Sequence, residues 1–127
     1  MIDIESKVIA AVKSALLTDY PDILVYSMMI PSPENFPCVC VEEIDNYIHE
    51  NAMTTSNIEN VAEVTYEVNV YSNSKTGKKS EAKAIFQIID NTLSDMGFIR
   101  EYTRPVTMDN GTVYRFTARY TTLATNN

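Results

Sequence analysis

Two segments of the chain place apolar residues at three- and four-residue spacing, which is the period of an amphipathic helix. The first segment covers residues 2–17, where polar residues and a proline end the pattern. The second begins between Gly77 and Ser80, and its apolar stripe consists of Ala82, Ile85, Phe86, Ile89, Leu93 and Met96. Gly97 follows at the position of a left-handed C-cap, so we expect the second helix to end there with Phe98 packed against it.

Between the two predicted helices the chain carries three segments typical of strands. Residues 23–30 are apolar on both faces and lie between two prolines, which is the pattern of a buried strand. Residues 36–47 place two valines on one face and two cysteines on the other. Residues 62–70 alternate apolar and polar positions, so we expect one buried face and one solvent-exposed face there.

Residues 49–60, between the second and third predicted strands, are polar and show no period. A long polar segment between two strands predicts a mobile surface loop. We interpret it as an assembly loop that becomes ordered on contact with a partner. Its candidate contact residues are His49, Asn51, Met53, Asn57 and Ile58.

The last part of the chain is predicted to be a β-hairpin. An Asn-Gly pair at 110–111 is a strong signal for a two-residue turn between residues 98–108 and 112–123. Such a turn pairs Arg104 with Thr117 across the two strands. It also places every arginine of the chain on one face of the hairpin: Arg100, Arg104, Arg115 and Arg119.

The predicted order is a helix, three strands, a second helix and two strands. Strands clustered in this way favour an α+β fold, with a largely antiparallel sheet and both helices packed on it. The chain has 127 residues, a common length for one domain, and no repeat or linker divides it. We therefore expect residues 1–127 to form a single domain.

Composition narrows the class of protein. Hydrophobic residues make up 45 % of the chain and charged residues 21 %, which excludes a disordered tail. The net charge of −7 disfavours sequence-independent binding to nucleic acid or to an anionic membrane. No run approaches the roughly 20 apolar residues that span a bilayer, and acidic residues near the start argue against a signal peptide. Cys38 and Cys40 stand at the limit of disulfide reach on one strand, and two free thiols fit a reducing cytoplasm.

Charge is distributed unevenly along the chain. Residues 1–74 contain 12 acidic and 2 basic side chains, whereas residues 75–127 contain 5 acidic and 8 basic ones. A molecule with two oppositely charged parts can attract a second copy head to tail, a geometry that generates rings. An unpatterned surface charge is the alternative interpretation of the same feature.

No segment carries a recognisable catalytic, metal or cofactor motif. The single histidine, His49, lies in the polar loop, where a catalytic base would depend on a mobile residue. Cys38, Cys40 and His49 lack the paired spacing of a zinc site. The acidic residues at 42–45 are more typical of an exposed strand edge than of a cation site. We therefore expect a protein without enzymatic activity, bound metal or cofactor.

The basic residues are better explained by binding than by catalysis. The segment 75–80 precedes the second helix but lacks the first glycine of a phosphate-binding loop. We interpret Lys78 and Lys79 there as contacts for an acidic partner surface. The four-arginine face leaves three interpretations open: phosphate contacts, ion pairs with the acidic half of a neighbouring subunit, or a solvated face.

Most of the chain resembles the tail terminator proteins of long-tailed bacteriophages, also described as tail completion or head-tail joining proteins. The resemblance is carried by Tyr66–Asn73, Ile88–Phe98, Arg100, Pro105, Asn110–Phe116, Arg119 and Tyr120. The N-terminal helix and the extended segment at residues 36–39 are similar in placement.

The resemblance implies a ring of small α+β subunits, typically sixfold, that caps the tail tube, ends its polymerisation and joins the tail to the head. Its implied partners are further copies of the chain, the tail tube protein and a head-side connector or neck protein. DNA would pass through the ring without specific binding, and no membrane is involved. The implied location is the head-proximal end of the tail in the virion, after assembly in the bacterial cytoplasm. We expect the four arginines and two lysines to contact neighbouring subunits or the tube. A head-completion or neck adaptor protein, and a protein-binding domain outside the virion, remain alternatives.

Overall fold

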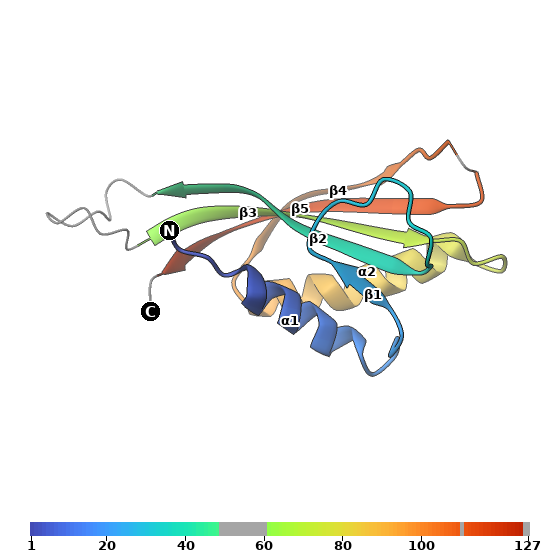
Figure 1. Ribbon diagram of the computed structural model, residues 1–127, viewed down its shortest axis with the longest axis horizontal. Coiled ribbons are helices and arrows are strands. Elements are labelled where there is room, and N and C mark those ends of the chain that lie inside the picture. The colour runs from blue at the N-terminus through green and yellow to red at the C-terminus, as the bar shows by residue number, and fades with distance from the viewer. Residues whose placement is uncertain (49–60, 110, 126–127) are drawn as a thin grey trace, which may run out of the picture.

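The computed structural model describes residues 1–48, 61–109 and 111–125 (Figure 1). Its elements are α1 (Glu5–Leu16), β1 (Leu24–Tyr26), β2 (Cys38–Ile48), β3 (Val61–Ser72), α2 (Lys78–Asp95), β4 (Ile99–Val106) and β5 (Tyr114–Thr125). This is the predicted order of a helix, three strands, a helix and two strands, and the fold is α+β. Neither of the described helices is long and apolar enough to cross a membrane.

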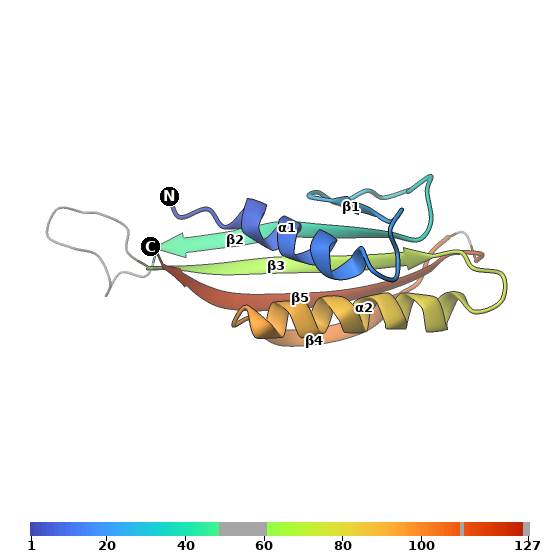
Figure 2. The same cartoon turned by 90° about the horizontal axis from the view of Figure 1, so that it is seen from below.

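The five strands form one sheet in the order β1-β2-β3-β5-β4. The short β1 pairs with β2 in parallel, and the other three pairs are antiparallel. Both helices lie on one face of this sheet, with α1 across β2 and β3 and α2 along β5 (Figure 2). We call this the helix face and the opposite one the outer face. β1 and β4 are therefore the two lateral edges of the molecule.

The main core lies between the helices and the sheet, and its composition follows the predicted apolar stripes except at Met96, which is 36 % exposed at the end of α2. From the helices it takes Val8, Val12, Leu16, Ala82, Ile85, Phe86, Ile89 and Leu93. The end of α2 is also as predicted, because Gly97 has a φ of 93° and the Phe98 N–H donates to the Leu93 carbonyl at 2.9 Å. Phe98 is buried and packs edge-to-face on Tyr66 at 5.6 Å between ring centroids.

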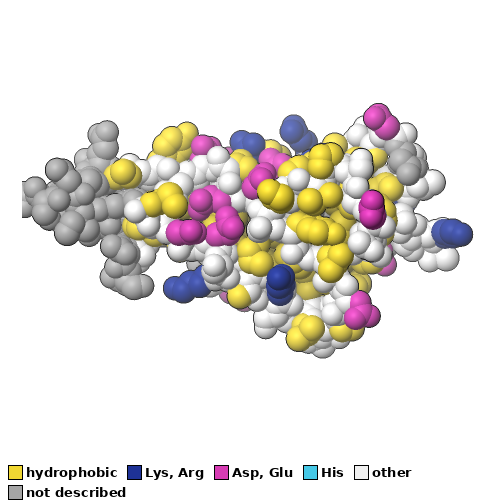
Figure 3. All heavy atoms as spheres, viewed as in Figure 1, with side chains coloured by type: hydrophobic (Ala, Val, Ile, Leu, Met, Phe, Trp, Pro, Cys, Tyr) yellow, Lys and Arg dark blue, Asp and Glu magenta, His cyan; other side chains and the backbone are white. Residues whose placement is uncertain are grey.

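The prediction of a buried strand over residues 23–30 is confirmed as to the strand but wrong as to its length and its burial. Only Leu24–Tyr26 form a strand, and they lie at the edge of the sheet, where the Leu24 side chain is 41 % exposed. The segment is apolar on both faces because the residues after the strand pack on the outer face of the sheet and not on the main core. Met29 and Ile30 leave the strand and pack over Cys38, Cys40 and Tyr71 on the outer face. In Figure 3, hydrophobic side chains gather over this segment between β1 and β2.

Cys38, Cys40 and Tyr71 form a second apolar cluster, on the outer face. The prediction that β3 has one solvent-exposed face is also wrong. Val61–Ser72 does alternate as predicted, but the outer-face residues Thr65 and Asn69 are 8 % and 2 % exposed. The neighbouring strands and the segments around Met29 and Met108 cover much of the outer face near the cluster. Polar residues on β3 are therefore not a reliable sign of solvent contact.

The hairpin has the predicted register. Arg104 pairs with Thr117, as the sequence indicates. The paired ladder is described as far as Val106 and Arg115, and the predicted two-residue turn beyond it stays a prediction. Of the Asn-Gly pair, residue 110 lies outside the described part of the chain. A bulge at Glu101 then shifts the register at the other end of β4.

Candidate functional site

The outer face of the β4–β5 hairpin carries three of the four arginines. Cross-strand partners share a face, so pairing of Tyr102 with Arg119 and of Arg104 with Thr117 places these side chains on the outer face. Arg115 follows on the same face of β5, because it stands two residues from Thr117. Three arginines therefore line one surface, as the sequence predicts.

Arg100 does not belong to this surface, which corrects the prediction that all arginines share one face. The bulge at Glu101 pairs Arg100 with Tyr120, a core residue, and so turns Arg100 to the helix face. There its Nη1 donates to Asp90 Oδ1 at 3.1 Å, and the Tyr120 hydroxyl donates to the same oxygen at 2.7 Å. Arg100 thus joins β4 to α2.

Arg104 and Arg119 share one aromatic partner on the outer face. Their guanidinium carbons lie 5.1 Å and 5.3 Å from the centroid of the Tyr102 ring. Cation–π contact of this kind stabilises an arginine without neutralising it. Arg119 also forms a long ion pair with Glu67 at 3.6 Å, and its buried Nε has no hydrogen-bond partner among the described residues. We call Tyr102, Arg104 and Arg119 the arginine–tyrosine cluster.

Arg115 is held inside the fold. Its Nε donates to Asn69 Oδ1 at 2.8 Å, and its guanidinium lies 5.6 Å from the centre of the Tyr71 ring. A weaker contact joins Nη2 to the Met29 sulfur at 3.8 Å. These contacts tie β5 to β3 and to the segment after β1. Of the outer-face arginines, Arg104 and Arg119 are the ones left for a partner.

The two candidate lysines differ in the same way. Lys78 Nζ donates to the Gly111 carbonyl at 3.0 Å, so it holds the hairpin connection against the start of α2. Lys79 is exposed on α2 and makes no polar contact within the described residues. The candidate assembly loop with His49, Asn51, Met53, Asn57 and Ile58 lies outside the described residues.

An exposed apolar patch lies at the end of the sheet near the first residue of β4. Ile99 is 73 % exposed and Leu123 56 %. Ile99 and Leu123 also line a shallow pocket of about 550 Å³ together with Met96. Clustered apolar side chains at a protein surface mark sites of protein–protein contact more often than sites of chemistry.

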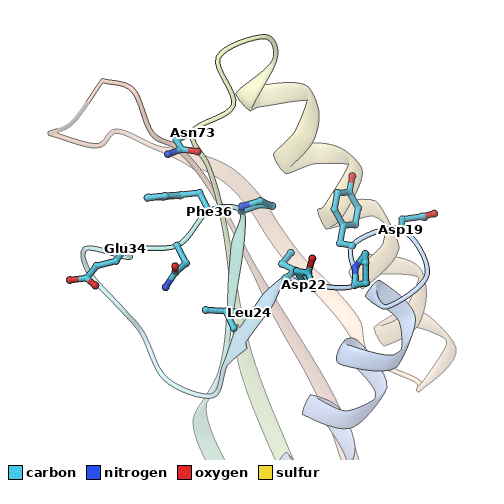
Figure 4. A pocket seen from close by; sticks show the side chains of 11 residues that line it. Asp19, Asp22, Leu24, Glu34, Phe36 and Asn73 are labelled. Atoms are coloured by element: carbon cyan, nitrogen blue, oxygen red, sulfur yellow. The ribbon is translucent and has the colours of Figure 1, made fainter.

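A second pocket, of about 670 Å³, opens beside β1 at the other edge of the sheet (Figure 4). Asp19 and Asp22 line it from the segment after α1, and Glu34 lines it from the segment between β1 and β2. In Figure 4 the Asp19 and Glu34 side chains point outward on opposite sides of the pocket. Leu24 and Phe36 supply apolar parts of its wall. All three carboxylates are exposed, and none has an ion-pair partner within the described chain. We call this the acidic pocket.

The buried titratable groups are held in their neutral forms. Burial raises the pKa of the Cys38 thiol to about 12, and burial also raises the pKa of Cys40. Burial and the neighbouring Asp90 carboxylate raise the pKa of Tyr120. A thiol that stays protonated is a poor nucleophile. Within residues 1–48, 61–109 and 111–125, no group of three or more His, Cys, Asp or Glu side chains could hold a metal ion.

Two features of these surfaces were not predicted from the sequence. Tyr102 shares the outer face with Arg104 because the two are two residues apart, and this alternation was a usable signal. The acidic pocket was not detectable as a site, because Asp19, Asp22 and Glu34 line one pocket only in the folded chain. The acidic excess of the first 74 residues was the only feature of the sequence that pointed to the acidic pocket.

No protein-family model and no curated protein matches this sequence. Among solved structures, the fold is similar to the PVC sheath/tube terminator in the extended state, from the cryo-EM structure of an extracellular contractile injection system. The TM-score is 0.55 at 13 % sequence identity. The similarity covers 100 % of this chain, which spans 57 % of the length of that chain. At this identity the similarity establishes the likeness of the folds.

Proposed function

We propose that this chain is the terminator subunit of a tube-based particle, a bacteriophage tail, in which six copies form a ring that caps the tail tube. The observation that carries the proposal is the similarity of the fold, over the whole chain, to a sheath/tube terminator. The segments that resemble phage tail terminators in the sequence support the same role. The ring ends tube polymerisation and joins the tail to the head-side connector.

The surfaces of the molecule support a role in assembly. Within the described residues Arg104 has no ion-pair partner, and Arg119 has only the long contact with Glu67; both lie on the outer face of β4 and β5. The carboxylates of the acidic pocket have no ion-pair partner among the same residues and lie beside β1, so the two sides of the sheet carry opposite charges. The patch at Ile99 and Leu123 adds exposed apolar surface of the kind that a partner protein covers. A subunit with two different binding edges makes head-to-tail contacts, which close into a ring when the rotation fits.

The remaining parts of the proposal follow from that role. The ring contacts the tail tube protein on one side and the connector on the other, and it resides at the head-proximal end of the tail after assembly in the bacterial cytoplasm. DNA passes through without specific binding, in keeping with a net charge of −7. The protein acts as a structural component without enzymatic activity, cofactor or membrane contact.

The test combines mass measurement with a tube-length assay. Native mass spectrometry of the purified chain, alone and with tail tube protein, should show a species of six chains in at least one condition. Addition of the chain to polymerising tube protein should stop elongation, and electron microscopy should then show shorter tubes with one end capped. A chain that stays monomeric in both conditions and leaves tube length unchanged contradicts the proposal. Binding to a portal-side ring without binding to the tube would assign the chain to the neck adaptors.

A further inference from the structure

The arginine–tyrosine cluster is a charged surface that the chain itself leaves unsatisfied. Arg104 is exposed, and its one polar contact within the described residues is with the Tyr102 ring, which leaves its charge unpaired. Arg119 has a single carboxylate, Glu67, at the long distance of 3.6 Å. Guanidinium groups bind carboxylates through paired N–H donors, so this cluster fits an acidic surface.

The acidic pocket has the complementary composition. Its rim carries Asp19, Asp22 and Glu34, and no lysine or arginine lines it. Its wall includes Leu24 and Phe36, so it offers apolar surface as well as charge. An arginine side chain has an aliphatic stem and a charged head, and therefore suits a pocket with apolar walls and a carboxylate rim.

The two surfaces lie at opposite edges of the same sheet. In the order β1-β2-β3-β5-β4, the acidic pocket adjoins the first strand and the cluster lies on the last two. Strands are spaced about 4.8 Å apart, so the edges are separated by roughly 19 Å. One chain therefore cannot bring its own cluster to its own pocket, but a second copy placed edge to edge can do so.

We propose that Arg104 and Arg119 of one copy dock on the acidic pocket formed by Asp19, Asp22 and Glu34 of the next copy. This inference rests on the proposed ring and specifies its subunit contact. The contact is heterologous, since two different surfaces meet, and each copy contributes one of each. Arg100, Arg115 and Lys78 take no part, because they are engaged within their own chain.

A second copy fits the cluster better than DNA does. Two arginines on a chain of net charge −7 give little attraction to a phosphate backbone. A second copy supplies the three carboxylates that line its acidic pocket, none of which has an ion-pair partner among the described residues. The other occupants become outcomes of the experiment below.

The experiment uses two charge-reversed variants and a matched control. The first is Arg104→Glu with Arg119→Glu, and the second is Asp22→Arg with Glu34→Arg. The control, Lys13→Glu with Lys83→Glu, makes the same change in net charge as the first variant at exposed positions on α1 and α2. None of the four reversed interface side chains lies in the core, so each variant is expected to fold. Circular dichroism checks that it does.

Each reversed variant should need on the order of a hundredfold higher concentration to assemble, because like charges then face each other. The control should assemble as the wild type does. An equimolar mixture of the two variants should assemble again. The acidic cluster of the first variant then meets the basic pocket of the second, and the unchanged cluster of the second meets the unchanged pocket of the first. Native mass spectrometry should show alternating rings with equal numbers of the two chains.

The outcomes separate this inference from the proposed function. If the first variant assembles like the wild type, or if the mixture stays dissociated, the inference is wrong while the ring stands. If the first variant forms rings but no longer binds the tube, or binds DNA less tightly, the cluster serves the tube or DNA instead. A wild-type chain that never self-associates overturns both proposals.

Discussion

The hydrogen bond between Tyr120 and Asp90 gives a sharp test of how α2 is joined to the sheet. The Tyr120 side chain is 1 % exposed, and its hydroxyl donates to Asp90 Oδ1 at 2.7 Å. Tyr120→Phe removes this bond and leaves the ring in place. A hydrogen bond to a charged group contributes about 1.5–3 kcal/mol. Asp90 keeps Arg100 as a partner and is 20 % exposed to water, so we expect the lower end, about 1.5 kcal/mol.

Urea unfolding followed by circular dichroism measures this change, which corresponds to a fall in Tm of about 5 °C. Tyr114→Phe is the matched control, because the Tyr114 hydroxyl has no partner in the described chain, and it should shift stability by less than about 0.5 kcal/mol. Arg100→Ala should cost at most about 1 kcal/mol, since that side chain is 46 % exposed. If Tyr120→Phe costs no more than the control, the bond does not join α2 to β5.

Three further predictions follow from other parts of the fold. Gly97→Ala should destabilise the protein by about 1–2 kcal/mol in the same urea assay, because Gly97 has a φ of 93° while its added Cβ would meet no atom closer than 3.9 Å. Gly111→Ala, where a Cβ meets no described atom within 4 Å, is its control, and equal effects would refute the backbone explanation. The Cys38 thiol, with its pKa raised to about 12, should react with iodoacetamide at least about a hundredfold more slowly in the native protein than in urea, as mass spectrometry of the labelled chain can show. Burial raises the pKa of Glu43 despite the hydrogen bond from Tyr66, so the native state loses stability as pH rises through that pKa. Glu43→Gln should therefore raise the urea midpoint at pH 7, and the gain should vanish below about pH 4.5; a gain that persists at acid pH would point to another cause.

Much of the fold could be predicted because it depends on local patterns. The apolar stripe of α2 and the C-cap at Gly97 are encoded within a few residues, and both are confirmed except that Met96 is exposed. The hairpin register was predictable from the position of the turn, and Arg104 does pair with Thr117. The two-residue turn itself stays a prediction, because residue 110 lies outside the described part of the chain.

The errors arise where tertiary contacts decide the structure. Residues 23–30 have the composition of a buried strand, but Met29 and Ile30 satisfy their burial by packing on the outer face. Asn69 has the pattern of an exposed residue, yet Arg115 and the covering segments bury it. The bulge at Glu101 has no local signature, and it decides which face Arg100 takes. The sequence therefore predicted an arginine-lined face on the hairpin, but the structure was needed to show which arginines lie on it.

The bulge also affects what kind of association the β4 edge permits. A regular edge strand offers an unbroken row of backbone donors and acceptors, and such rows add further strands without limit, as in fibrils. In β4 the row is interrupted at Glu101 by the bulge and at Pro105 by the missing N–H. Contacts at this edge must then be made mainly by side chains, which are saturated once their complement is bound. The same irregularity that removes Arg100 from the outer face thus guards the molecule against open-ended aggregation.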